Sequence, residues 1–161
     1  MFRIGFGTDI HRLVGGRPLV IGGVEIESDL GAEGHSDADV LMHAAADAVL
    51  GSLALGDLGT HFPNDEERWR NAPSAQFLEY AVGLVRERGF RVVNFDSVVD
   101  LERPKLRPHI ETMRGNLAAA LGLDISDVSV KAKTGEAVDA VGDRRAVRAQ
   151  AIVLIENRTF L

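Results

Sequence analysis

The chain has 161 residues, of which 45% are hydrophobic and 26% are charged, so it is long enough to bury the core of one ordinary globular domain. Its formal net charge of −6 disfavours a nucleic-acid partner, because a polyanionic backbone is repelled on average. The chain contains no cysteine, which excludes disulfides and restricts the ligands of any metal to nitrogen and oxygen atoms.

The first half of the chain predicts strands followed by a long helix. Residues 2–7 are strand-like, and residues 17–27 are typical of a hairpin with a glycine turn. Residues 36–55 carry apolar side chains at helical spacing, with Ser36 as a candidate N-cap. Residues 56–71 are polar and contain a proline, which indicates a loop.

The second half alternates strands and helices. Apolar periodicity predicts helices at 74–88 and 108–121, and β-rich segments predict strands at 91–101, 128–133 and 147–155. The resulting order β-β-β-α-α-β-α-β-β indicates an α+β fold, with helices layered on one face of a sheet.

No feature divides the chain into smaller units. It has no linker rich in proline, glycine or serine and no repeat, so we expect a single domain over residues 1–161. The apolar runs are too short to span a bilayer, and the N-terminus shows no basic segment followed by an apolar one. We therefore expect a cytoplasmic protein.

Two short segments gather residue types that bind metals. Asp9 and His11 are two residues apart, which in an extended chain places both on the same side. Asp39, His43 and Asp47 are four residues apart and would share one face of a helix. Two imidazoles and one carboxylate leave an open fourth position on Zn²⁺, as in catalytic zinc sites. We therefore predict that Asp9, His11 and His43 bind one zinc ion.

Each of these residues has a plainer explanation when taken singly. Asp9 could brace a turn, His43 could bond to a neighbouring acid on its own helix, and His35 with Ser36 could merely begin that helix. The two segments nevertheless hold three of the five histidines, and this clustering favours the metal site.

Two further segments suit phosphate groups. In residues 102–109, prolines stiffen a loop before a helix N-terminus, and Lys105 could bind a diphosphate there. In residues 131–136, Thr134 could donate to a phosphate oxygen and Glu136 could hold Mg²⁺. A solvated basic loop explains the first segment equally well, and a plain strand end explains the second better when it stands alone. All three lysines lie in these two segments, which favours a shared anion site.

Five motifs, in this order and at these spacings, give the chain a family resemblance over about residues 1–155. They are Gly7-Thr8-Asp9-Ile10-His11-Arg12; His35-Ser36-Asp37-Ala38-Asp39 with His43; Gly56-Asp57-Leu58-Gly59 with Phe62-Pro63; Arg103-Pro104-Lys105-Leu106; and Lys131-Ala132-Lys133-Thr134 with Glu136. The set closely resembles the 2-C-methyl-D-erythritol 2,4-cyclodiphosphate synthase family of the non-mevalonate isoprenoid pathway. The resemblance implies a homotrimer with active sites between neighbouring subunits.

The resemblance also implies a reaction. The 2-phosphate of 4-diphosphocytidyl-2-C-methyl-D-erythritol 2-phosphate would attack the β-phosphorus of the diphosphate, close a cyclodiphosphate and expel CMP. Zinc would bind the β-phosphate, and Mg²⁺ or Mn²⁺ near Glu136 would bridge the α- and β-phosphates. His35 and Thr134 would stabilise the five-coordinate phosphorus, with Ser36 assisting.

The substrate contacts implied by the resemblance fall into three groups. Around the metal they are Asp9, His11, His35 and Ser36. Around the methylerythritol part they are Asp57, Gly59, Phe62, Asn64, Asp65 and Glu66. Around the cytidine diphosphate part they are Arg103, Pro104, Lys105, Leu106, Arg107, Lys133, Thr134 and Glu136.

The chain departs from the family at several positions. Ala38 replaces a usual glycine, and the 64–66 segment differs from the family sequence. Ala140 and Asp143 stand where the family has a phenylalanine and an arginine near a central cavity that accepts an isoprenoid diphosphate. We hypothesise that such binding is weakened here or is moved to Arg144 or Arg145.

Two other functions remain open at the level of sequence. One is a zinc-dependent phosphoester hydrolase, in which the open zinc position carries hydroxide. The other is a metal-stabilised trimer without enzymatic activity.

Overall fold

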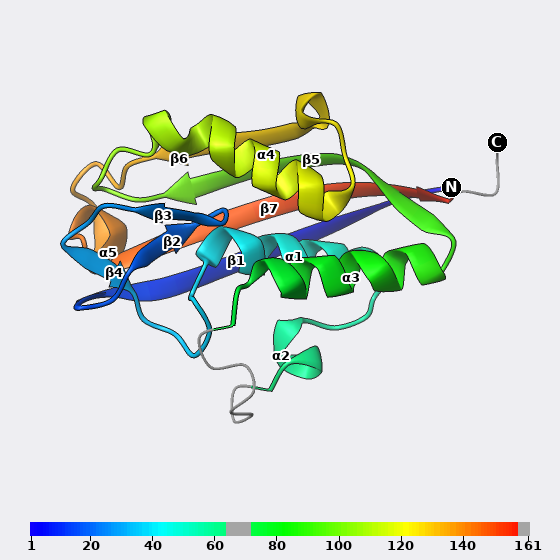
Figure 1. Ribbon diagram of the computed structural model, residues 1–161, viewed down its shortest axis with the longest axis horizontal. Coiled ribbons are helices and arrows are strands. Elements are labelled where there is room, and N and C mark those ends of the chain that lie inside the picture. Colours follow the sequence, from blue (N-terminus) through cyan, green and yellow to red (C-terminus); the bar gives the residue numbers. More distant parts are fainter. Residues whose placement is uncertain (64–71, 158–161) are drawn as a thin grey trace.

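The structure is a computed structural model that describes residues 1–63 and 72–157. Its centre is a five-stranded sheet with the strand order β4-β1-β7-β5-β6 (Figure 1). The strands are β1 (Phe2–Gly15), β4 (Leu30–Ala32), β5 (Phe90–Asp100), β6 (Val128–Lys133) and β7 (Ala146–Asn157). The pair β5–β6 is parallel and the other pairs are antiparallel, so the sheet is mixed.

Three long helices cover one face of this sheet (Figure 1). They are α1 (Val40–Ser52), α3 (Ala75–Glu87) and α4 (Ile110–Leu121). This arrangement confirms the predicted α+β domain with helices on one face. No helix in the described ranges is long and apolar enough to cross a membrane.

Shorter elements complete the fold. The strands β2 (Leu19–Ile21) and β3 (Val24–Ile26) form the predicted hairpin as a separate two-stranded sheet. The helices α2 (Leu58–His61) and α5 (Asp139–Gly142) are one turn each, and 3₁₀ turns occupy Arg107–His109 and Ile125–Asp127. The sequence did not predict β4, α2 or α5.

The first strand is twice as long as predicted. It continues to Gly15 and pairs with β7 as far as Arg12, so Asp9 and His11 lie in the middle of a strand and not at its end. On the face that meets the helices, Gly5 and Gly7 are followed by Asp9, His11 and Leu13. The polar pair interrupts the apolar alternation there, which explains why the sequence pattern ended the strand early.

Helix α1 packs with its backbone directly against β1. A Cβ atom on Gly5 would lie 1.8 Å from the carbonyl oxygen of Ala48, and one on Gly7 would lie 2.1 Å from that of Ala44. Only glycine allows this approach, because any side chain would overlap the helix backbone. The short separation lets His43 on α1 reach the side chains of β1.

The beginning of α1 is fixed by Asp39, not by Ser36 as predicted. The carboxylate of Asp39 is fully buried and accepts hydrogen bonds from Leu41 N at 3.1 Å and Met42 N at 3.0 Å. It also accepts from Gly22 N at 2.9 Å and Gly23 N at 2.6 Å, which ties the β2–β3 turn to the helix. Burial raises the pKa of this carboxyl group, although the N–H groups of Gly22, Gly23 and Met42 oppose that shift. Asp39 is therefore a structural cap rather than a metal ligand.

Candidate metal centre and adjoining pockets

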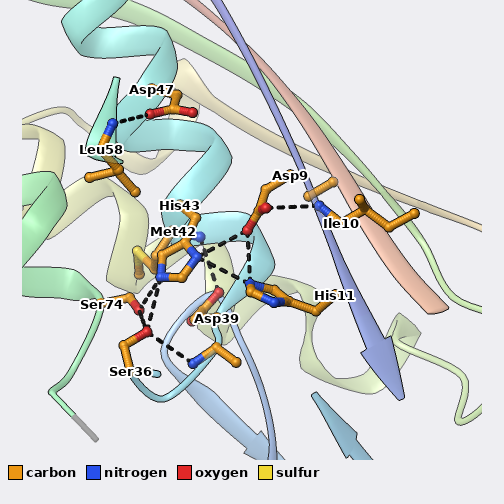
Figure 2. A network of polar contacts seen from close by, with 12 residues as sticks. Asp9, Ile10, His11, Ser36, Asp39, Met42, His43, Asp47, Leu58 and Ser74 are labelled. Atoms are coloured by element: carbon orange, nitrogen blue, oxygen red, sulfur yellow. Dashed lines mark hydrogen bonds and ion pairs between the residues drawn. The ribbon is translucent and has the colours of Figure 1, made fainter. Parts of the chain in front are cut away.

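Three side chains from two distant parts of the chain meet at one point. Asp9 and His11 extend from the same side of β1, and His43 extends toward them from the first turn of α1 (Figure 2). Asp9 Oδ2 lies 2.9 Å from His11 Nε2 and 3.0 Å from His43 Nδ1. The two imidazole nitrogens lie 3.2 Å apart. The structure therefore brings together the three ligands that the sequence predicts.

This triangle of donor atoms fits a zinc ion. Zinc binds imidazole nitrogen and carboxylate oxygen at about 2.0–2.1 Å, so two ligands of a tetrahedral site lie roughly 3.3 Å apart. The observed separations of 2.9, 3.0 and 3.2 Å approach that value. Two neutral imidazoles and one carboxylate would leave the ion with a net positive charge and one free position.

Both histidines also form a contact through the ring nitrogen that faces away from the triangle. His11 Nδ1 lies 2.9 Å from the carbonyl oxygen of Glu33. His43 Nε2 lies 2.8 Å from Ser74 Oγ and 3.2 Å from Ser36 Oγ (Figure 2). Such contacts fix the tautomer and orientation of an imidazole that binds metal.

Charges within the triangle favour the ionised forms of Asp9 and His11 in the metal-free protein. Burial alone would raise the pKa of Asp9, but hydrogen bonds and charges from His11 and His43 outweigh it, and the pKa is lowered. Burial would lower the pKa of His11, but the hydrogen bond and charge of Asp9 outweigh it, and the pKa rises above 6.5. Protons therefore compete with a metal for His11, while Asp9 remains an anionic ligand.

The three donors form part of the wall of a pocket of about 450 Å³. Its lining residues are Asp9, His11, Gly34, His35, Ser36, His43, Asp47, Asp57, Leu58, Gly59, Phe62 and Phe77. The residues predicted around the metal and three of the six predicted around the methylerythritol part therefore share one cavity. Of the latter, Asn64, Asp65 and Glu66 lie outside the described residues.

Two carboxylates hold the wall of this pocket that is formed by α2. Asp57 Oδ1 accepts from Thr60 N at 2.9 Å and from Thr60 Oγ1 at 2.8 Å, and these hydrogen bonds lower the pKa of Asp57. Asp47 Oδ1 accepts from Leu58 N at 2.7 Å, which ties α1 to α2 (Figure 2). The sequence placed Asp47 on one face with His43 but gave it no role.

The residues predicted around the cytidine diphosphate part line two other hollows. One, of about 280 Å³ beside the end of β6, is lined by Leu101, Lys105, Leu106, Arg107, Ala132, Lys133, Thr134 and Glu136. The other, of about 680 Å³, is lined by Glu27, Ser28, Asp29, Arg103, Pro104, Lys105 and Arg144. Neither hollow shares a lining residue with the metal pocket. Within a single chain, Thr134 and Glu136 therefore line a different hollow from the candidate zinc ligands.

Two of the positions that depart from the family pattern lie near the end of α5. Ala140 belongs to that helix, and Asp143 follows it. Asp143 Oδ2 accepts from Arg145 Nη2 at 3.0 Å, and Arg144 Nη2 donates to Asp29 Oδ1 at 2.6 Å. Both arginines that we considered as alternative anion ligands thus have acidic partners already.

The position of Ala38 explains why glycine is usual there. Ala38 has a φ of 56° and is completely buried. A side chain in this left-handed region costs roughly 1–2 kcal/mol relative to glycine. The substitution therefore affects the loop before α1 and leaves the side chain of His43 untouched.

Sequence reasoning gave no role at the site to three residues of this region. Phe77 lies in α3, Ser74 is the N-cap residue of that helix, and Asp37 lies in the loop before α1. Ser74 and Phe77 appear in the sequence as an ordinary helix start and an ordinary apolar helix position. Only the tertiary contact between α1 and α3 gives them a place beside His43.

Comparison with known proteins shows the family of the chain. Residues 2–156 match the model of the YgbB family. A 2-C-methyl-D-erythritol 2,4-cyclodiphosphate synthase from Salinibacter ruber is 53% identical over 155 residues, which cover 96% of this chain and 99% of that protein. A chloroplastic synthase of the same name from Arabidopsis thaliana is 48% identical over 157 residues, which cover 98% of this chain and 68% of the relative. A solved synthase structure in a CDP-bound form matches with a TM-score of 0.88 and 41% identity, and covers 96% of this chain and 100% of that one. The chain therefore belongs to the YgbB family, the family of the 2-C-methyl-D-erythritol 2,4-cyclodiphosphate synthases.

Proposed function

We propose that the protein converts 4-diphosphocytidyl-2-C-methyl-D-erythritol 2-phosphate into 2-C-methyl-D-erythritol 2,4-cyclodiphosphate and CMP, in non-mevalonate isoprenoid biosynthesis. A 2-phosphate oxygen attacks the β-phosphorus, and the bond from that phosphorus to the CMP oxygen breaks, so the enzyme is a phosphorus–oxygen lyase. Family membership supports the reaction. The observation that carries it is the convergence of Asp9, His11 and His43 in the wall of a polar pocket.

The metal pocket has the groups that this chemistry needs. Asp9, His11 and His43 would hold Zn²⁺, which supplies Lewis acidity and a fixed point for a β-phosphate oxygen. His35 and Ser36 line the same wall and would donate to phosphoryl oxygens as charge develops on them. Nucleophile and leaving group are both phosphate oxygens, so positioning and charge neutralisation account for most of the rate.

The opposite wall suits a polyol. Asp57 keeps its carboxylate ionised through its hydrogen bonds to Thr60, and it can accept from substrate hydroxyl groups. The backbone of Gly59 and the ring of Phe62 line the space beside it. This wall would hold the methylerythritol part at a fixed distance from the metal.

The hollow beside β6 suits the nucleotide end of the substrate. Thr134 Oγ1 donates to the Glu136 carboxylate, which holds that carboxylate beside the hollow. One carboxylate is a suitable anchor for Mg²⁺ or Mn²⁺, because Mg²⁺ in phosphate sites takes most other ligands from water and phosphate oxygens. Lys105 and Lys133 line the same hollow and would offset the charge of a departing CMP.

We further propose a homotrimer whose active sites lie between neighbouring subunits. The metal pocket and the β6 hollow are separate within one chain, although one substrate must contact both. One face of the sheet carries no helix (Figure 1). On that face β1 and β7 expose large apolar side chains. These are Phe2, Ile4, Phe6, Ile10 and Ile152. A contiguous apolar surface of this kind is typical of a protein interface, and further copies of the chain would cover it.

Incubation with the diphosphocytidyl substrate, zinc and magnesium in ¹⁸O-labelled water tests the reaction. We expect release of CMP and a cyclic diphosphate without solvent oxygen. Incorporation of solvent oxygen into a phosphate product would instead indicate a phosphoester hydrolase.

A cytoplasmic location completes the proposal, because the substrate and products are charged phosphates that do not cross membranes unaided.

A further inference from the structure

The two ring nitrogens of His43 face different partners. Nδ1 faces the candidate metal position, 3.0 Å from Asp9 Oδ2 and 3.2 Å from His11 Nε2. Nε2 faces the opposite way and lies 2.8 Å from Ser74 Oγ (Figure 2). A metal on Nδ1 leaves the ring proton on Nε2, so Nε2 must act as a donor and Ser74 Oγ as its acceptor.

The hydroxyl hydrogen of Ser74 has its own acceptor. Ser74 Oγ donates to Asp37 Oδ1 in a short contact, and Ser74 N donates to Asp37 Oδ2 at 3.0 Å. Asp37 N in turn donates to the carbonyl oxygen of Ala72 at 3.2 Å. All hydrogen bonds from the imidazole to the carboxylate can therefore run in one direction, from His43 through Ser74 to Asp37.

Both serines near His43 are buried, and their positions relative to the metal pocket separate their roles. Ser74 is completely buried and does not line the metal pocket, so a substrate in that pocket does not contact it. Ser36 Oγ lies farther from His43 Nε2, at 3.2 Å, and Ser36 lines the pocket. Ser36 Oγ also accepts from Ala38 N at 3.2 Å, so Ser74 is the closer acceptor for His43, and Ser36 is the serine that a ligand in the pocket can reach.

We infer that Ser74 and Asp37 are positioning residues of the metal centre, which fix the tautomer and orientation of His43 through a carboxylate–serine–histidine relay. The inference rests on the proposed metal binding by His43 and extends it to two residues outside the pocket. His11 has a different arrangement, because its outer contact is a backbone carbonyl that no side-chain substitution removes. The relay therefore makes His43 the ligand whose orientation depends on other side chains.

Zinc affinity tests the relay directly. Zinc dissociation constants would be measured by chelator competition for the wild type and for Ser74→Ala, Asp37→Asn and Ser52→Ala. Loss of an outer partner of a metal-binding histidine weakens metal affinity by about 10- to 100-fold, and we expect Ser74→Ala and Asp37→Asn to fall in this range. Ser52→Ala is the matched control, because it removes a buried serine hydroxyl that donates to Val49 O near the other end of α1. Its zinc affinity should equal that of the wild type.

A spectroscopic measurement separates positioning from general loss of stability. In ¹⁵N-labelled, zinc-loaded wild type, His43 should show a protonated Nε2 whose hydrogen exchanges slowly with water. In Ser74→Ala this exchange should be faster, while Ser74→Thr, which keeps the hydroxyl, should retain slow exchange and zinc affinity close to the wild type. If Ser74→Ala does not fold, two measurements still test the inference. They are the tautomer of His43 in the zinc-loaded wild type and the zinc affinity of Asp37→Asn.

The possible results distinguish the relay from the proposed function. Wild-type protein that binds zinc and releases CMP, with unchanged zinc affinity in Ser74→Ala and Asp37→Asn, would overturn the relay alone. A zinc-loaded His43 that is protonated at Nδ1 would also overturn it. Wild-type protein that binds no zinc would remove the metal centre and the relay together.

Discussion

The metal pocket and the β6 hollow are built in different ways. In the metal pocket, partly buried side chains from β1, α1 and α2 meet across long stretches of sequence and hold each other through hydrogen bonds. The β6 hollow is lined by two short segments, and Lys105, Lys133 and Glu136 there are exposed to solvent. One chain thus preorganises the metal half of the proposed site, whereas in the proposed trimer its nucleotide half would face a neighbouring subunit.

The largest effect on activity is expected when the metal half loses one of its ligands. In His43→Ala, the triangle loses one of its three donors, so zinc binding should be lost and CMP release should fall by about a thousandfold or more. Metal analysis and a CMP-release assay measure both quantities. Full activity with one zinc ion per chain would contradict the assignment of His43.

The close packing of α1 on β1 provides the second prediction. In Gly7→Ala, the added Cβ would lie 2.1 Å from Ala44 O and 2.6 Å from Ala48 N, so we expect a loss of about 3 kcal/mol in the free energy of unfolding. Gly83→Ala is the matched control, because Gly83 lies within α3 and a Cβ there meets no atom within 4 Å. That variant should be more stable by about 0.5–1 kcal/mol. Urea unfolding of both variants checks the difference, and equal stabilities would contradict the close approach.

Trimers that mix two variants test whether the metal half and the nucleotide half of one active site come from different subunits. His43→Ala removes the metal half and Glu136→Ala removes the nucleotide half, so each variant alone should be nearly inactive. If an active site takes one half from each of two neighbouring subunits, random mixed trimers from equal amounts should contain about one quarter intact sites. Coexpression with differently tagged chains and assay of the purified mixture measure this recovery. A mixture as inactive as its parents would show that both halves come from one chain.

The smallest effect expected concerns pH. In the metal-free protein the pKa of His11 lies above its ordinary value of 6.5, so the folded state binds more protons than the unfolded state just above pH 6.5. Stability of the metal-free protein should therefore fall as the pH rises through the raised pKa of His11. Zinc requires neutral His11, so the stability added by zinc should increase over the same range. Thermal unfolding with and without zinc checks this, and parallel pH slopes would contradict the pairing of Asp9 with His11.

Elements with local signals were predictable from the sequence. The strand β6 has the predicted bounds, and α3 and α4 differ from prediction by one or two residues, because apolar periodicity and flanking turn residues define them. The start of α1 was not predictable to the residue. Its preceding segment contains a serine and two aspartates that can all cap a helix, and only the contact with the β2–β3 turn selects Asp39.

The metal ligands were predictable and their surroundings were not. Asp9, His11 and His43 stand out because their residue types and spacings suit one zinc ion. The glycine contacts that bring α1 onto β1, and the Ser74–Asp37 contact behind His43, join residues far apart in the sequence. No local pattern carries such information. The same holds for the separation of Thr134 and Glu136 from the metal pocket, which depends on the topology of the sheet.

A crystal structure of the zinc-loaded protein, with diffraction data collected at the zinc absorption edge, tests the central claim most directly. We expect one anomalous peak per chain, at about 2.0–2.2 Å from Asp9 Oδ2, His11 Nε2 and His43 Nδ1. The fourth position should hold water or a phosphate oxygen. A peak elsewhere, or a fourth protein side chain bound to the ion, would contradict the account.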